Sequence, residues 1–389
     1  LQEVVGHQYG DHFYPNMSGV LRSINYYPIG NETAEDGIAS LALGLGKYIV
    51  DGGLTLRVSP YHPDQVMQTS EVETALRETQ TQFYALDMSD VGSDFKVNDG
   101  FNIMKLKVKD AEYDKSLNYI VSTFDPYDQM IYDGLYDGGR KIISFAGVLQ
   151  QDVFPLPEIL QMSMKYGAGA MRRPVEIEFA CNINEDKTGE FYLLQIRPIV
   201  EAKGMLEEDI TKTSDNSCLL RSHNSLGHGI STDVVDVVYV KYDDNFSAMN
   251  NYYVADDIER INRRFLSEGK NYVLVGPGRW GSSDHYLGVP VKWPHISAAR
   301  IIVELALKNY HVDPSQGTHF FQNLTSFGVG YFTIDCNSEN GGIIRKDVLD
   351  AMPAIEETDY VRHVRFDKPL KIMMDGKKQE GAIVMDESK

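Results

Sequence analysis

The order of hydrophobic and polar positions predicts a chain of mixed strands and helices. Alternating apolar residues predict strands at 19–27, 54–58, 103–108, 118–122 and 142–145. Small residues over 38–50 predict a helix, interrupted by glycine, and the polar stretch 70–86 predicts a surface helix or a linker. Two prolines open a further predicted helix over 155–166, which Gly167 and Gly169 should end.

The strongest local pattern is a hairpin at residues 175–198. Its first strand, 175–180, places Glu176 and Glu178 on one face and apolar residues on the other. Residues 184–189 provide the polar turn, and 191–198 form the returning strand.

A second unit is expected after an acidic linker that ends near residue 216. Its predicted strands are 217–221, 234–240, 272–275 and 330–335, and its predicted helices are 256–268 and 296–310. Short strands are expected over 343–389. The sequence therefore predicts an α/β (α+β) protein divided at 1–200, 217–342 and 343–389.

Composition narrows the possible partners. The chain has 389 residues and a net charge of −19, which argues against a nucleic-acid partner because phosphate backbones are bound by clustered Lys and Arg. No apolar run approaches the ~18 residues of a membrane span. The three widely spaced cysteines are typical of reduced thiols in a cytoplasmic protein. The start at Leu1 shows no signal-peptide pattern and reads like the middle of a strand, so we expect it to lie inside a domain.

The hairpin carries residues that could hold a metal and phosphates. Mg²⁺ prefers carboxylate and amide oxygens, which Glu178 and Gln195 offer, and the fork of Arg197 suits phosphate. These residues would form one wall of a Mg–ATP site. Their spacing alone favours the alternative, a solvated strand face with weak Glu–Arg pairs.

The amino-acid sequence of the hairpin favours the Mg–ATP site over the solvated strand face. The hairpin has the sequence V-E-I-E-F-A, a turn and F-Y-L-L-Q-I-R-P. This sequence resembles the D-I-E-W, turn, L-Y-I-L-Q-A-R-P signature of the phosphoenolpyruvate synthase and pyruvate phosphate dikinase family. The resemblance implies an ATP-grasp nucleotide-binding domain. It implies that Glu178 and Gln195 contact the metal and that Arg197 contacts ATP phosphates. Glu176, which stands where the family has Asp, is expected among the nucleotide-binding residues.

Upstream residues extend the resemblance across 1–200. Residues 18–21 are similar to the family's S-G-V-L-F-T strand, and 43–52 are similar to its G-L-G-E-x-V-V-x-G segment. That segment implies that Gly44 and Gly46 lie near the nucleotide. Lys47 replaces the family's Glu, which puts that contact in doubt.

Other parts of the family pattern are not found. The glycine-rich G-G-K-G and R-S-S-A segments, which supply further phosphate contacts, do not occur, so we expect an N-terminal part of the same protein to complete the site. A pyruvate-binding (β/α)₈ barrel of roughly 250 residues does not fit after residue 200. This chain alone is expected to be inactive and to bind ATP weakly.

Histidines in the second unit give weaker signals. His319 follows Thr318 about where the family carries a phosphorylated histidine, but Phe320 follows it, and a hydrogen-bonded structural role is the alternative. His223 and His228 could ligate a metal or shape a turn. The loop 276–284 could cradle an anion or be a tight loop packed by Trp280.

The sequence thus predicts a fragment of an ATP-dependent phosphotransferase that uses ATP and Mg²⁺ and passes phosphate through a histidine to pyruvate or another small acceptor. The alternative is a non-catalytic nucleotide-sensing module that kept the ATP-grasp fold. Neither interpretation involves nucleic acid or a membrane.

Overall fold

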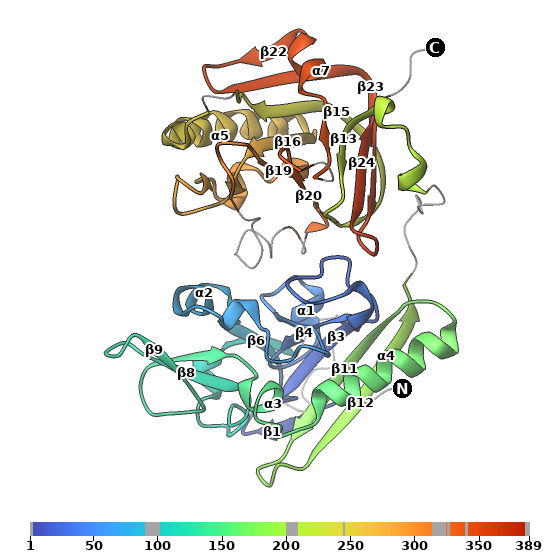
Figure 1. Ribbon diagram of the computed structural model, residues 1–389. Coiled ribbons are helices and arrows are strands. Elements are labelled where there is room, and N and C mark those ends of the chain that lie inside the picture. Colours follow the sequence, from blue (N-terminus) through green and yellow to red (C-terminus); the bar gives the residue numbers. More distant parts are fainter. Residues whose placement is uncertain are drawn as a thin grey trace. The chain divides into compact units, whose positions relative to one another are not determined.

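The computed structural model describes residues 3–89, 102–199, 209–243, 246–312, 324, 327–338 and 341–385 (Figure 1). The chain divides into two compact units. Unit 1 comprises Leu1–Asn25 and Glu35–Ile199, and unit 2 comprises Tyr26–Ala34 and Val200–Lys389. Strands dominate both units, and the mixed α/β class expected from the sequence is confirmed.

The main sheet of unit 1 is antiparallel, in the order β12-β11-β3-β4-β5. Its strands are β3 (Met17–Arg22), β4 (Ile38–Ala42), β5 (Leu56–Val58), β11 (Val175–Ile183) and β12 (Gly189–Pro198). The predicted hairpin is therefore present as β11 and β12. Helix α4 (Leu156–Met171) runs along these two strands in Figure 1, and its Leu160 and Met164 share a buried cluster with Val175 and Ile177. The apolar face of the hairpin is thus covered, which leaves the Glu176–Glu178 face for polar contacts.

Two smaller antiparallel sheets complete unit 1. One has the order β1-β2-β6-β7 and the other β10-β8-β9. Their strands are β1 (His7–Tyr9), β2 (His12–Tyr14), β6 (Gln82–Asp87), β7 (Ile103–Lys107), β8 (Val121–Asp125), β9 (Met130–Asp133) and β10 (Arg140–Ile143). Three short helices lie between strands or helices of unit 1: α1 (Lys47–Val50) after β4, α2 (Val72–Glu78) before β6 and α3 (Ala146–Leu149) after β10.

Two helix predictions in unit 1 need correction. The expected helix over 38–50 is strand β4 followed by the short helix α1, because Ile38–Ala42 pairs with β3 on one side and β5 on the other. Gly167 and Gly169 lie inside α4 and do not end it; the chain leaves the helix at Arg172, which has a left-handed φ of 53°. Packing against the sheet outweighs the low helix propensity of glycine here.

Unit 2 is built on a long mixed sheet in the order β14-β20-β19-β16-β15-β23-β24-β13-β21, with β22 pairing with β23. Its strands are β13 (Cys218–Ser222), β14 (Ser225–Leu226), β15 (His228–Val240), β16 (Tyr272–Pro277), β19 (Ala299–Ala306), β20 (Gly330–Asp335), β21 (Ile343–Ile344), β22 (Ala354–Glu357), β23 (Val361–Asp375) and β24 (Glu380–Val384). Helices α5 (Asn251–Glu268) and α7 (Lys346–Ala351) and a small pair of strands, β17 (Arg279–Trp280) and β18 (Gly288–Val289), accompany it. Strands β15, β16, β19 and β20 are mutually parallel.

The helix predicted over 296–310 is wrong. Strand β19 occupies its centre, between β16 and β20. Ile301, Ile302 and Val303 are all fully buried, as expected of a parallel strand that is covered on both faces. Apolar runs of this kind fit a helix and a buried strand equally well, and the pairing on both sides decides for the strand.

Candidate functional site

The polar face of the hairpin brings the predicted residues into register. Glu178 lies directly opposite Gln195, and Glu176 lies directly opposite Arg197. Because side chains two residues apart share a face, all four lie on the face of the sheet that α4 does not cover. Glu178, Gln195 and Arg197 therefore share one face of two antiparallel strands, but of the three only Glu178 and Gln195 are among the described residues that line a common hollow.

A hollow of about 580 Å³ opens beside the Glu178–Gln195 pair. This volume lies in the usual range of small-ligand sites, roughly 300–1,000 Å³. The described residues that line it come from β3, β11, β12, the segment before β1, the loop before β3 and the loop after β4: Glu3, Val4, Val5, Pro15, Ser18, Leu45, Gly46, Glu178, Ala180, Leu194 and Gln195. A carboxylate and an amide oxygen thus face one hollow, and this donor set fits Mg²⁺.

One lining residue could not be expected from strict alternation. Leu194 should face away from Gln195, yet both line the hollow. The register shifts after Glu178, because Phe179 pairs with Leu193 and Leu194 is the extra residue of a β-bulge. Bulges re-aim side chains in this way, and no composition signal marks this one.

Arg197 and Glu176 lie one row further along the strands. Glu176 Oε1 accepts hydrogen bonds from Nε of Arg197, at 2.9 Å, and from its Nη2. Burial alone would raise the pKa of Glu176, but the hydrogen bonds from Arg197 and Arg22 outweigh it and hold the pKa below its usual range. Arg197 Nη2 is also 3.9 Å from Oε1 of Glu178, so the two rows are in electrostatic contact.

The glycine segment contributes in two different ways. Gly46 lines the hollow, whereas Gly44 does not appear among its described lining residues. Gly44 has a φ of +84°, and a Cβ there would lie 2.6 Å from the carbonyl oxygen of Tyr84, so this position needs glycine for its turn. Its own carbonyl accepts a 2.7 Å hydrogen bond from Ser18 Oγ. Lys47 forms an ion pair with Asp51 at 3.0 Å.

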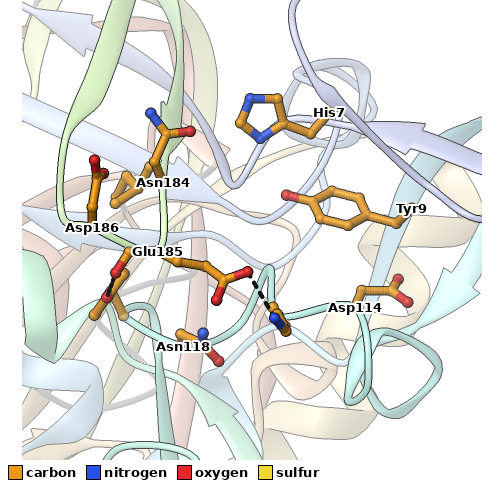
Figure 2. A pocket seen from close by; sticks show the side chains of 10 residues that line it. His7, Tyr9, Asp114, Asn118, Asn184, Glu185 and Asp186 are labelled. Atoms are coloured by element: carbon orange, nitrogen blue, oxygen red, sulfur yellow. Dashed lines mark hydrogen bonds and ion pairs between the residues drawn. The ribbon is translucent and has the colours of Figure 1, made fainter.

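A second hollow in unit 1, of about 510 Å³, lies at the turn of the hairpin. Figure 2 shows His7 and Tyr9 on one side, and Asn184, Glu185 and Asp186 on the other. Lys115 pairs with Glu185 at 2.8 Å, and Asp114 accepts a 2.6 Å hydrogen bond from Tyr14. Lys115 and Glu185, which both line this hollow, thus form an ion pair with each other.

In unit 2, the loop after β16 is packed by Trp280. This side chain is buried, and its indole N–H donates to the carbonyl of Val303 at 3.1 Å. The loop borders a cavity of about 220 Å³, whose described lining includes Glu304 and Asp335 and neither lysine nor arginine. An anion in that cavity would therefore meet two carboxylates.

The remaining histidines have separate surroundings. His223 Nδ1 is 2.9 Å from Oε1 of Glu380, and the His228 ring stacks on Tyr26 with centroids 4.4 Å apart. Within the described ranges, no group of three or more His, Cys, Asp and Glu is placed to hold a metal ion. His319, the phosphohistidine candidate, lies outside the described residues.

The fold and the hairpin define unit 1 as an α+β domain with a polar hollow beside one face of its main sheet. Residues 1–217 match the family model described as the pyruvate phosphate dikinase AMP/ATP-binding domain. The match spans more than half of the chain, so the chain belongs to this family, and the resemblance of the hairpin signature is confirmed. A comparison with curated proteins finds no match. Among the described helices, none is both long and apolar enough to cross a bilayer.

Proposed function

We propose that unit 1 binds ATP together with Mg²⁺ on the polar face of β11 and β12. The observation that carries the proposal is the direct pairing of Glu178 with Gln195 at the wall of one 580 Å³ hollow. Bound Mg²⁺ would neutralise charge on the phosphate oxygens. Glu178 and Gln195 would hold the ion, and Arg197, one row away, would bind phosphate oxygens through its planar fork.

We further propose that the protein is an ATP-dependent phosphotransferase of the phosphoenolpyruvate synthase type. ATP binding by a pyruvate phosphate dikinase family domain supports this proposal. In it, phosphate passes through a histidine to pyruvate or another small acceptor, and His319 is the residue proposed to carry it. A neutral imidazole can accept a phosphoryl group because it is nucleophilic near pH 7.

Replacing Glu178 with glutamine should weaken Mg²⁺-dependent ATP binding at least about tenfold, since loss of even an outer partner of a metal ligand costs about that much. The measurement is calorimetric titration of the chain with ATP, with and without excess Mg²⁺. Glu190→Gln is the matched control, because it removes the same charge from the same hairpin, near its turn, outside the described lining of the hollow. Equal affinities of the wild-type chain and Glu178→Gln for ATP in excess Mg²⁺ would refute the proposed role of Glu178 as a metal ligand.

The phosphotransferase proposal has its own test. The full-length protein, including the N-terminal part expected to complete the ATP site, is incubated with ATP labelled at the β-phosphate, and acid-labile phosphate is mapped. We expect label on His319 and its loss in His319→Ala. No label on any histidine would overturn transfer through histidine and leave the non-catalytic nucleotide-sensing module as the better account.

A further inference from the structure

Three charged side chains form a straight row across the main sheet of unit 1. Glu176 on β11 pairs with Arg22 of β3 on one side and with Arg197 of β12 on the other. The strands β3, β11 and β12 are neighbours in the sheet (Figure 1). The row carries two positive charges and one negative charge, so its net charge is positive.

Each carboxylate oxygen of Glu176 serves one arginine. Oε2 accepts from Nε of Arg22 at 2.7 Å, and Oε1 accepts from Nε of Arg197 at 2.9 Å. The Glu176 side chain is only 10 % exposed, whereas those of Arg22 and Arg197 are 59 % and 56 % exposed. The negative charge of Glu176 is therefore buried between two guanidinium groups that are exposed at the surface.

The contact at Nε fixes the plane of the Arg22 guanidinium. Within the part of the chain that the structure describes, the Nη groups of Arg22 have no hydrogen-bond partner. They remain as donors of the planar fork that matches phosphate oxygens. The row lies two residues along the strands from the Glu178–Gln195 pair, which is roughly 7 Å.

We propose that Arg22 is a second phosphate-binding residue and that Glu176 positions both arginines. The ligand class is the charged phosphate chain of a nucleoside triphosphate, whose metal end would lie at Glu178 and Gln195. Glu176, which stands where the family has Asp, would act through Arg22 and Arg197 on this account. The inference rests on the proposed binding of Mg–ATP to the same face.

A surface ion-pair network without a ligand would look similar in its contacts but not in its binding behaviour. Exposed pairs of this kind stabilise a fold by only about 0–1 kcal/mol. A phosphate-binding row instead makes affinity depend on the number of phosphate groups. The deciding measurement therefore compares ATP with AMP on the same variants.

In Arg22→Gln, we expect the Kd for Mg–ATP to rise about tenfold and the Kd for AMP to change less than about twofold, because one charge-assisted contact to the phosphate chain is lost. Arg22→Lys keeps the positive charge but not the planar fork, so its Kd for Mg–ATP should lie between those of the wild-type chain and Arg22→Gln. Glu176→Gln should weaken ATP binding and spare AMP. Arg140→Gln is the control, since Arg140 is exposed and belongs to the separate β10-β8-β9 sheet.

Thermal unfolding of each variant verifies that it is folded. If Arg22→Gln binds ATP like the wild-type chain while Glu178→Gln does not, the role of Arg22 is refuted and the proposed function stands. If both variants bind like the wild-type chain, the proposed function itself is refuted. An equal loss for ATP and AMP in Arg22→Gln would assign Arg22 to the fold and would also refute its phosphate role.

Discussion

Replacing Asp236 with alanine should destabilise unit 2 by about 3 kcal/mol, because removing one partner from a buried ion pair leaves uncompensated charge. Asp236 is 1 % exposed on β15. Its carboxylate accepts from His363 Nε2 at 2.7 Å and from Arg365 Nε at 2.8 Å. The expected cost lies at the lower end of the usual range because Arg365 is 39 % exposed and can turn toward water.

The network behind Asp236 explains why water cannot simply replace it. His363 is also 1 % exposed, and its Nδ1 lies 3.0 Å from Nη2 of Arg264. Because the guanidinium can only donate, Nδ1 accepts and Nε2 carries the proton donated to Asp236. Burial alone would raise the pKa of Asp236, but the hydrogen bonds from His363 and Arg365 outweigh it and lower the pKa.

The measurement can be confined to unit 2. The chain has two tryptophans, Trp280 and Trp293, and both belong to unit 2. Urea unfolding followed by tryptophan fluorescence therefore reports this unit, even though the whole chain need not unfold in two states. Asp233→Ala, at an exposed position of the same strand, is the control. A midpoint for Asp236→Ala equal to that of the control would contradict the buried-charge account.

The hairpin was predictable because two independent signals agree there. The V-E-I-E-F alternation gives the strand period, and the polar turn before residue 190 gives the connection. The direct pairing of Glu178 with Gln195 and of Glu176 with Arg197 does not follow from this pattern, because it depends on the bulge at Leu194. The resemblance of the same residues to a family signature then linked the pattern to ATP.

Strands that depend on distant partners were not predictable in the same way. Residues 299–306 read as one stripe of a helix, and only the neighbouring strands β16 and β20 make them β19. Residues 38–42 are small and suit a helix, yet β3 and β5 enclose them as β4. Propensity is a weak prior when tertiary pairing satisfies the backbone on both sides.

The site was only partly visible for a related reason. The sequence predicted Glu178, Gln195 and Gly46 as site residues, and all three line one hollow. Leu194 joins them through a bulge, and Arg22 reaches Glu176 from 154 positions away in the chain. Alternation within one strand cannot predict the bulge at Leu194 or the contact between Arg22 and Glu176, because both depend on the register between strands.

One glycine lies opposite the residue that follows Glu178. Gly19 on β3 pairs directly with Phe179, the residue that follows Glu178, and a Cβ at Gly19 would lie 2.2 Å from Cζ of the Phe179 ring. The ring is 1 % exposed and stacks on Phe191 with centroids 5.1 Å apart, so it has little room to move. Gly19→Ala should therefore destabilise unit 1 by about 3 kcal/mol, the upper part of the range for overpacking, and weaken ATP binding by displacing Glu178.

The steric origin of that loss can be isolated by a compensating change. Adding Phe179→Leu to Gly19→Ala removes the ring that the new methyl group meets, so the two substitutions should couple favourably by at least about 1 kcal/mol. Thermal unfolding and hydrogen exchange of the β11 amides measure stability, and ATP titration measures the site. Gly169→Ala in α4 is the control, because a Cβ there meets no atom within 4 Å and alanine favours a helix. Purely additive effects of the two substitutions would show that Gly19 acts through something other than contact with Phe179, and the link between this glycine and the placement of Glu178 would then fail.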